Sequence, residues 1–89
     1  MALLKDLDDL ETNGRMGDWC FINNNTYMAV RYAEHHFNIV VLPITGSSGW
    51  KWNGSREFPT LSPSILVHEQ PEWNESWHGW LRNGILETA

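Results

Sequence analysis

The sequence predicts a single α+β domain that is mostly β, in which a short amphipathic helix is followed by six or seven short, largely antiparallel strands. Two observations predict this class. Leucines at helical spacing occur only near the N-terminus, and the remaining chain consists of short aromatic and β-branched runs separated by Asn, Gly and Pro. A length of 89 residues allows one domain, spanning 1–89, with the helix at 2–12 and the β-rich body at 15–89.

The helix is predicted from an apolar stripe with acidic residues between its members. Asn13-Gly14 ends it, because both residues favour the conformations found after a helix C-terminus. A helix of three turns is marginal alone, so we expect its stripe to pack on the domain or on another subunit. The stripe consists of Leu3, Leu4, Leu7 and Leu10.

The first strands are predicted at 18–22 and 26–32, on either side of Asn23-Asn24-Asn25. Asparagine tolerates left-handed backbone geometry, so these segments are expected to form a hairpin. The near-continuous apolar run 37–42 suits a central strand, and Pro43 ends it or marks an edge.

The second half begins with a loop of small residues at 45–49, which leads into Trp50-Lys51-Trp52. On a strand this alternation places both tryptophans on one face and Lys51 on the other. Pro59 and Pro63 bracket an extended segment, and 64–68 reads as another strand. The C-terminal segments 76–82 and 85–88 flank Asn83-Gly84, which is the strongest hairpin signal in the chain.

Charge and cysteine content restrict the partners. A net charge of −5 opposes binding to long nucleic acids or an anionic membrane, and no apolar run is long enough for a membrane span. Cys20 is the single cysteine and has apolar neighbours, which indicates a buried reduced thiol and a cytoplasmic protein. We expect no cofactor and no metal, because His68 and His78 lack ligand spacing.

Six tryptophans are more large rings than so small a core readily holds, so some are expected to face a ligand or a partner chain. The short chain also favours a homo-oligomer, a dimer or tetramer. The best binding candidates are Trp50 and Trp52 beside Lys51 and Arg56, because flat rings stack on nucleobases and cations meet phosphate. Alternatively, the rings fill the core or an interface.

Three hydroxyls, those of Thr60, Ser62 and Ser64, are predicted to share one face of a proline-stiffened segment. They would hydrogen-bond a base, a ribose or a phosphate, or simply form a polar strand edge. A hydrolase is the other alternative. Ser62 or Ser64 would be its nucleophile, His78 its base, and an acid such as Glu57 or Glu75 would orient the histidine, although no glycine-flanked nucleophile elbow is present.

Three motifs carry a resemblance to known proteins: Trp50-Lys51-Trp52-Asn53-Gly54, the segment 58–66 with Pro-Thr-Leu-Ser-Pro-Ser-Ile, and 77–85 with a histidine-aromatic hairpin. They resemble those of small phage-encoded proteins that are often labelled ammonia monooxygenase. The serine and histidine motifs are also similar to those of a peptidase family found beside bacterial ubiquitin-like operons. That family brings cysteines and further acids around the motif, whereas this chain has Cys20 alone, far upstream.

The sequence also looks like a member of a family of phage sponge proteins that counter the bacterial CBASS defence. This resemblance implies an immune-evasion protein in the cytoplasm of an infected host, which binds a small anionic cyclic dinucleotide without cleaving it. A two-fold oligomer suits a ligand with two similar halves. The expected ligand-binding residues are Trp50, Lys51, Trp52, Arg56, Thr60, Ser62, Ser64, Trp80 and Arg82, and the alternative function is a serine peptidase-like hydrolase using Ser62 or Ser64 with His78.

Overall fold

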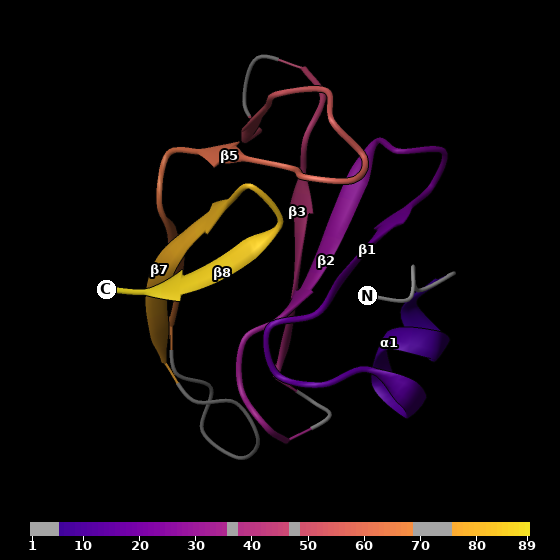
Figure 1. Cartoon of the computed structure of the whole chain (residues 1–89), viewed down its shortest axis with the longest axis vertical. Helices are drawn as coiled ribbons and strands as arrows, with labels where there is room; N and C mark the ends of the chain where they lie inside the picture. Colours follow the sequence, from indigo (N-terminus) through magenta and orange to yellow (C-terminus); the bar gives the residue numbers. More distant parts are fainter. Residues whose placement is uncertain (1–5, 36–37, 47–48, 69–75) are drawn as a thin grey trace.

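The computed structural model describes residues 6–35, 38–46, 49–68 and 76–89. These residues contain one helix and eight strands, and the strands form three small antiparallel sheets (Figure 1). This arrangement confirms the predicted mainly β fold. The expectations for Leu3, Leu4 and Glu75 lie outside the described residues. The elements are α1 (Leu7–Asn13), β1 (Trp19–Ile22), β2 (Tyr27–Arg31), β3 (Ile39–Pro43), β4 (Lys51–Trp52), β5 (Leu61–Ser62), β6 (Ile65–Val67), β7 (Trp77–Arg82) and β8 (Ile85–Thr88).

Helix α1 begins later than the predicted residue 2. Asp6 has an extended backbone and its side chain accepts a hydrogen bond from the Asp9 amide, so Asp6 is the N-cap and Leu7 the first helical residue. At the other end the Gly14 amide donates to the Leu10 carbonyl and the last helical residue is Asn13, one residue beyond the predicted end at 12. The leucine stripe places Leu10, fully buried, against the first sheet.

The first sheet has the order β1-β2-β3, with antiparallel pairs throughout. The predicted asparagine turn connects β1 and β2: Asn23, Asn24 and Asn25 have φ angles of 53°, 56° and 64°. Three successive residues in the left-handed region are accessible because asparagine is tolerated there far better than branched residues. The hairpin prediction is therefore confirmed.

The remaining strands form a two-stranded sheet, β4-β5, and a three-stranded sheet, β6-β7-β8. The predicted hairpin between β7 and β8 is confirmed, and its turn residues Asn83 and Gly84 have φ angles of 50° and 77°. The strand count exceeds the predicted six or seven, because Leu61–Ser62 pairs with Lys51–Trp52 as a separate short sheet. Between β5 and β6 the chain bends at Pro63, and its Ser62-Pro63 bond is cis.

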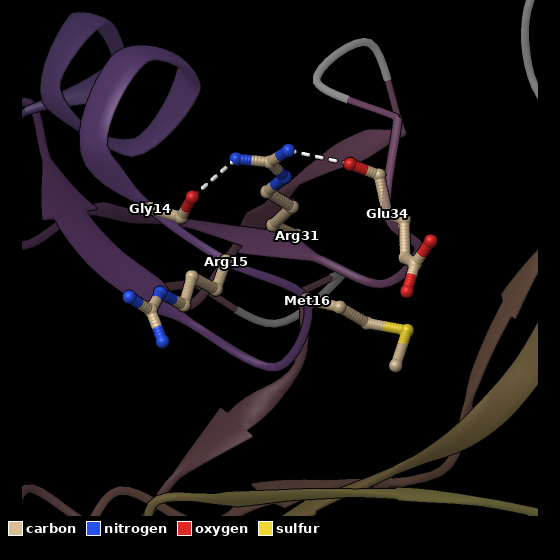
Figure 2. Close-up of a pocket in the computed structure, with 5 residues that line it drawn as sticks. All are labelled: Gly14, Arg15, Met16, Arg31 and Glu34. Atoms are coloured by element: carbon tan, nitrogen blue, oxygen red, sulfur yellow. Dashed lines mark hydrogen bonds between the residues drawn. The ribbon is translucent and has the colours of Figure 1, made fainter.

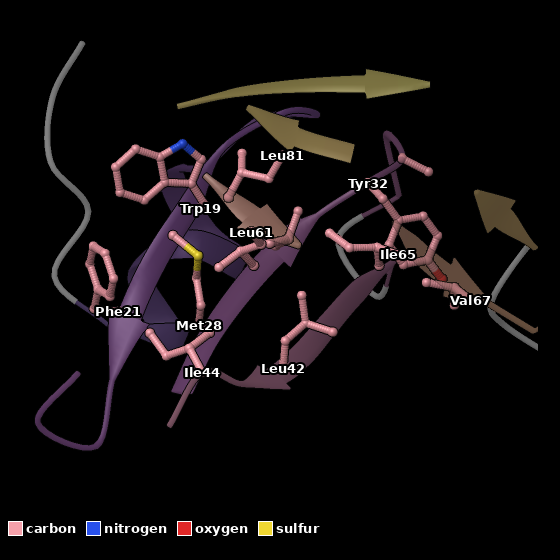
Figure 3. Close-up of a cluster of buried hydrophobic side chains, with 12 residues drawn as sticks. Trp19, Phe21, Met28, Tyr32, Leu42, Ile44, Leu61, Ile65, Val67 and Leu81 are labelled. Carbon is pink, nitrogen blue, oxygen red and sulfur yellow. The ribbon is translucent and has the colours of Figure 1, made fainter. Parts of the chain in front are cut away.

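Three layers follow from these pairings. Figure 1 shows the first sheet between α1 on one side and the β7-β8 hairpin on the other. The main core lies between the first sheet and the two smaller sheets, and Figure 3 shows the side chains that fill it. Its buried members are Trp19, Phe21, Met28, Val30, Tyr32, Ala33, Leu42, Ile44, Leu61, Ile65, Val67 and Leu81.

Four of the six tryptophans take part in this core. Trp19 is buried in it, while Trp50, Trp52 and Trp77 are partly buried and pack against it. The prediction that Trp50 and Trp52 share a face opposite Lys51 agrees with the exposure pattern, because Lys51 is exposed. The alternative that both rings serve packing therefore has structural support.

The opposite face of the first sheet carries α1 and a second, smaller cluster of Leu10, Cys20 and Ala29. Cys20 is a free thiol and is fully buried, as predicted. Burial, together with the nearby charges of Asp6 and Asp9, raises the pKa of this thiol from 9.0 to about 11. Within the residues that the structure describes, no helix has the length and apolar character needed to cross a membrane.

Candidate functional site

Strands β6 and β7 bring a serine and a histidine together. Leu66 stands opposite His78 in the antiparallel register, so Ser64, two residues before Leu66, shares their face of the sheet. Ser64 Oγ lies 3.1 Å from His78 Nε2, which is hydrogen-bonding distance. We call these two residues the Ser64–His78 pair.

Aromatic and charged neighbours on β7 restrain the histidine. The ring of His78 lies 5.7 Å from that of Trp80, at an interplanar angle of 42°. The guanidinium carbon of Arg82 lies 4.7 Å from the centre of the Trp80 ring, and Arg82 in turn forms an ion pair of 3.1 Å with Glu87 on β8. The Trp80 ring, with Arg82 over it, therefore limits the space open to the imidazole on the β7 side.

Trp50 restrains the serine from another direction. Its indole Nε1 donates a hydrogen bond of 3.3 Å to the Ser64 carbonyl oxygen. Ser64 is half-buried and His78 is exposed, so solvent and a ligand can reach the pair. This backbone contact of Trp50 had no signal in the sequence, since it joins the residue before β4 to the residue before β6, 14 positions away.

Of the two acids expected to orient His78, only Glu57 lies in the described part of the chain, and it makes no hydrogen bond to the His78 ring. There, the only hydrogen bond of the His78 ring is the one to Ser64. Glu57 lies beside Gly84 in the turn after β7, and Glu75 lies outside the described residues. The described residues therefore show a serine hydroxyl in contact with an imidazole, and the expected role of Glu75 stays a prediction.

The three hydroxyls expected on one face serve different purposes. The Thr60 hydroxyl accepts a hydrogen bond of 2.9 Å from the Asn83 amide and so anchors the β7-β8 turn. Ser62 is exposed on β5 opposite Lys51, in the two-stranded sheet. Ser64 follows the bend at Pro63 and lies directly before β6. Of the two candidate nucleophiles, only Ser64 contacts His78.

The remaining residues of the expected nucleotide site divide into two groups. Trp52 packs against Phe21, with ring centres 5.1 Å apart, and Arg56 stacks on the same Phe21 at 4.8 Å. Trp52 also donates to the Ser55 carbonyl oxygen. Trp80 and Arg82 lie elsewhere, on β7 beside His78. Trp52 and Arg56 therefore form one cluster with Phe21, apart from the Trp80–Arg82 stack.

A separate open pocket of about 310 Å³ lies between the end of α1 and the loop after β2 (Figure 2). Figure 2 shows the Arg31 guanidinium bridging the carbonyl oxygens of Gly14 and Glu34, to which it donates hydrogen bonds. Arg31 is buried, and its Nε has no partner in the described residues. This arginine joins the helix end to the first sheet, and no predicted site residue lines the pocket.

A metal site also finds no support in the described ranges: among residues 6–35, 38–46, 49–68 and 76–89, no group of three His, Cys, Asp or Glu side chains is placed to hold a metal ion.

A serine hydroxyl hydrogen-bonded to an imidazole is the nucleophile and base arrangement of serine hydrolases. Residues 11–89 match the family model of the bacterial ubiquitination-like system serine protease, BubE, and the chain belongs to this family. The matched region includes both members of the Ser64–His78 pair. No curated protein and no solved structure matches the chain.

The family match confirms the similarity to a peptidase family. It does not bear on the predicted phage origin, the cyclic-dinucleotide ligand, the oligomeric state or the cytoplasmic location, which all stay predictions.

Proposed function

We propose that this protein is a serine peptidase in which Ser64 is the nucleophile and His78 the general base. The observation that carries the proposal is the 3.1 Å contact between Ser64 Oγ and His78 Nε2 within the matched family region. The family description associates such proteases with bacterial ubiquitination-like systems. We therefore expect the substrate to be a peptide or amide bond in a protein of such a system.

The chemistry follows from which nitrogen faces the hydroxyl. For His78 Nε2 to accept the serine proton, the imidazole proton must be on Nδ1. Ser64 Oγ then attacks the substrate carbonyl carbon while its proton passes to Nε2. His78 returns that proton to the leaving nitrogen, so the C–N bond breaks and an acyl group remains on Ser64. Water, deprotonated by His78, attacks the acyl carbon, and the proton from His78 restores the serine hydroxyl.

The orientation of His78 is expected to determine how fast the Ser64–His78 pair reacts. Loss of the acid from a Ser-His-Asp triad lowers kcat by about 10⁴-fold, largely because the histidine takes the wrong tautomer or orientation. Here Trp80, held by Arg82, lies against the His78 ring. We expect turnover of simple esters to be slow but dependent on both members of the Ser64–His78 pair.

The test is covalent labelling with a small alkyl fluorophosphonate, followed by peptide mass spectrometry. The wild-type protein should carry one adduct, on Ser64. Ser64→Ala should abolish the adduct, and His78→Gln should slow labelling by about 10²-fold or more, which is the lower range for loss of a general base.

Ser62→Ala is the matched control, because Ser62 lies two residues away, is exposed and has no contact with His78. It should label at the wild-type rate. Circular dichroism spectra of all variants should coincide. An adduct that persists in Ser64→Ala, or a wild-type protein in which Ser64 stays unlabelled, would overturn the proposed function.

A further inference from the structure

The outer edge of β6 has free backbone hydrogen-bonding groups beside the nucleophile. Strand β6 is at the edge of the sheet, because the order is β6-β7-β8. The Ala89 amide donates to the His78 carbonyl oxygen, so the backbone groups of His78 point toward β8. Leu66 stands opposite His78, and antiparallel alternation therefore turns the Leu66 N–H and C=O away from β7. No group in the described part of the chain bonds to them.

The position of the base determines the side from which a substrate approaches. His78 takes the Ser64 proton from the β7 side of the hydroxyl. The attacked carbonyl must approach Oγ from a direction other than that of His78 Nε2, because one atom cannot be contacted by the base and the electrophile from the same direction. The free edge of β6 lies away from β7 and offers such a direction.

Among the described residues of β6, Leu66 has both of its backbone groups turned to this edge. The carbonyl oxygen of Ser64 already accepts the hydrogen bond from Trp50. The backbone groups of Ile65 and Val67 face β7 by the same alternation. In an antiparallel pair, a single residue exchanges both of its backbone hydrogen bonds with one residue of the partner strand, whereas a parallel arrangement needs two partner residues.

We propose that the free edge of β6 binds the peptide substrate as an added antiparallel strand, with one substrate residue paired to Leu66. This inference rests on the proposed function and specifies its substrate as an extended segment. Because antiparallel chains run in opposite directions, the paired residue lies two positions N-terminal to the residue that carries the attacked carbonyl. The Leu66 side chain is 57% exposed on the face shared with Ser64 and His78, so it favours an apolar side chain on that substrate residue.

The probes are three reagents that modify the same atom. Acetyl-Leu-Ala-Ala diphenyl phosphonate presents leucine at the position paired with Leu66. The second reagent is the same peptide with a methyl group on the nitrogen of that leucine. The third is the small fluorophosphonate, which has no peptide. With the wild-type protein, N-methylation should slow Ser64 labelling by about tenfold, because it removes one of two backbone hydrogen bonds and introduces a clash at the edge.

Leu66→Pro removes the Leu66 N–H, which would donate a hydrogen bond to the carbonyl oxygen of the paired substrate residue. The Leu66 N–H makes no bond within the sheet, and proline is tolerated at such edge positions. In this variant the acetyl-Leu-Ala-Ala reagent should label Ser64 about tenfold more slowly than in the wild-type protein, because the Leu66 N–H no longer donates to it, while the small fluorophosphonate should react within twofold of the wild-type rate. Leu66→Thr keeps the N–H and is the matched control, which should react with the peptide reagent near the wild-type rate.

The outcomes separate the two proposals. If the small reagent labels Ser64 but N-methylation has no effect on the wild-type protein, β6 does not bind the peptide and the edge proposal is wrong, whereas the proposed function stands. If no reagent labels Ser64, the proposed function fails and the edge proposal fails with it. Should Leu66→Pro not fold, the N-methyl comparison on the wild-type protein decides the edge proposal alone.

Discussion

A single buried hydrogen bond connects the first sheet to the hairpin that carries His78. Trp19 Nε1 on β1 donates to the Gly84 carbonyl oxygen in the β7-β8 turn at 2.9 Å, across 65 residues of sequence. Trp19 is only 5% exposed, and its ring meets Phe21 edge to face. Replacement by phenylalanine keeps an aromatic ring but removes the donor, and so leaves a buried carbonyl oxygen without its partner.

The expected cost has two parts. An unpaired buried polar group costs about 1–3 kcal/mol, and the lost part of the indole ring adds ~1 kcal/mol of apolar burial and packing. Trp19→Phe should therefore lower the free energy of unfolding by about 2–4 kcal/mol. For a domain of this size, that decrease lowers Tm by about 10–25 °C.

Trp77→Phe is the matched control. Trp77 is only partly buried, and its Nε1 donates at 3.0 Å to the hydroxyl of Thr88 in an exposed position, where water can replace the lost partner. A phenylalanine can keep the stacking on Tyr32, so the cost should be below about 1 kcal/mol.

Urea unfolding followed by far-ultraviolet circular dichroism measures both variants without relying on tryptophan emission. Equal losses of stability in Trp19→Phe and Trp77→Phe would refute the reasoning, because the buried bond would then contribute no more than the exposed one.

Two further predictions concern Cys20 and the nucleotide hypothesis. The unfolded thiol ionises above pH 9 and the folded thiol only near pH 11, so the free energy of unfolding should fall by about 3 kcal/mol between these values. Cys20→Ala should lack this component, and identical pH profiles for both proteins would contradict it. In a thermal-shift panel, a sponge would show a higher Tm with a 3′,3′-cyclic dinucleotide and return it intact, whereas unchanged melting at millimolar ligand would exclude tight binding.

The local features of the fold were predictable because short-range chemistry determines them. Asn83-Gly84 specifies a tight hairpin turn, and Asn23-Asn24-Asn25 tolerates left-handed geometry wherever it occurs. The start of the helix was less predictable. Several acidic residues near the N-terminus can cap a helix, and only the extended backbone of Asp6 identifies the one that does.

The candidate site depended on long-range register, which residue types do not encode. Ser62 and Ser64 have the same chemistry and both follow the predicted pattern, yet Ser62 lies on β5 while Ser64 lies beyond the bend at Pro63 and directly precedes β6. The strand pairing of Leu66 with His78 then selects Ser64. Packing also decided the role of Trp52, since a ring suited to stacking on a base can equally well stack on Phe21.

The Ser64–His78 pair lies at a single sheet, which affects how its geometry responds to motion elsewhere in the protein. Ser64 directly precedes β6 and His78 lies on β7, 14 positions further along the chain, so the hydrogen bonds between β6 and β7 hold their backbones close together. Neither α1 nor a strand of the first sheet supplies an atom of the Ser64–His78 contact. Substitutions in α1 or in the first sheet should thus change the free energy of unfolding more than the rate at which the folded protein reacts at Ser64. Stability and reactivity can therefore be varied separately.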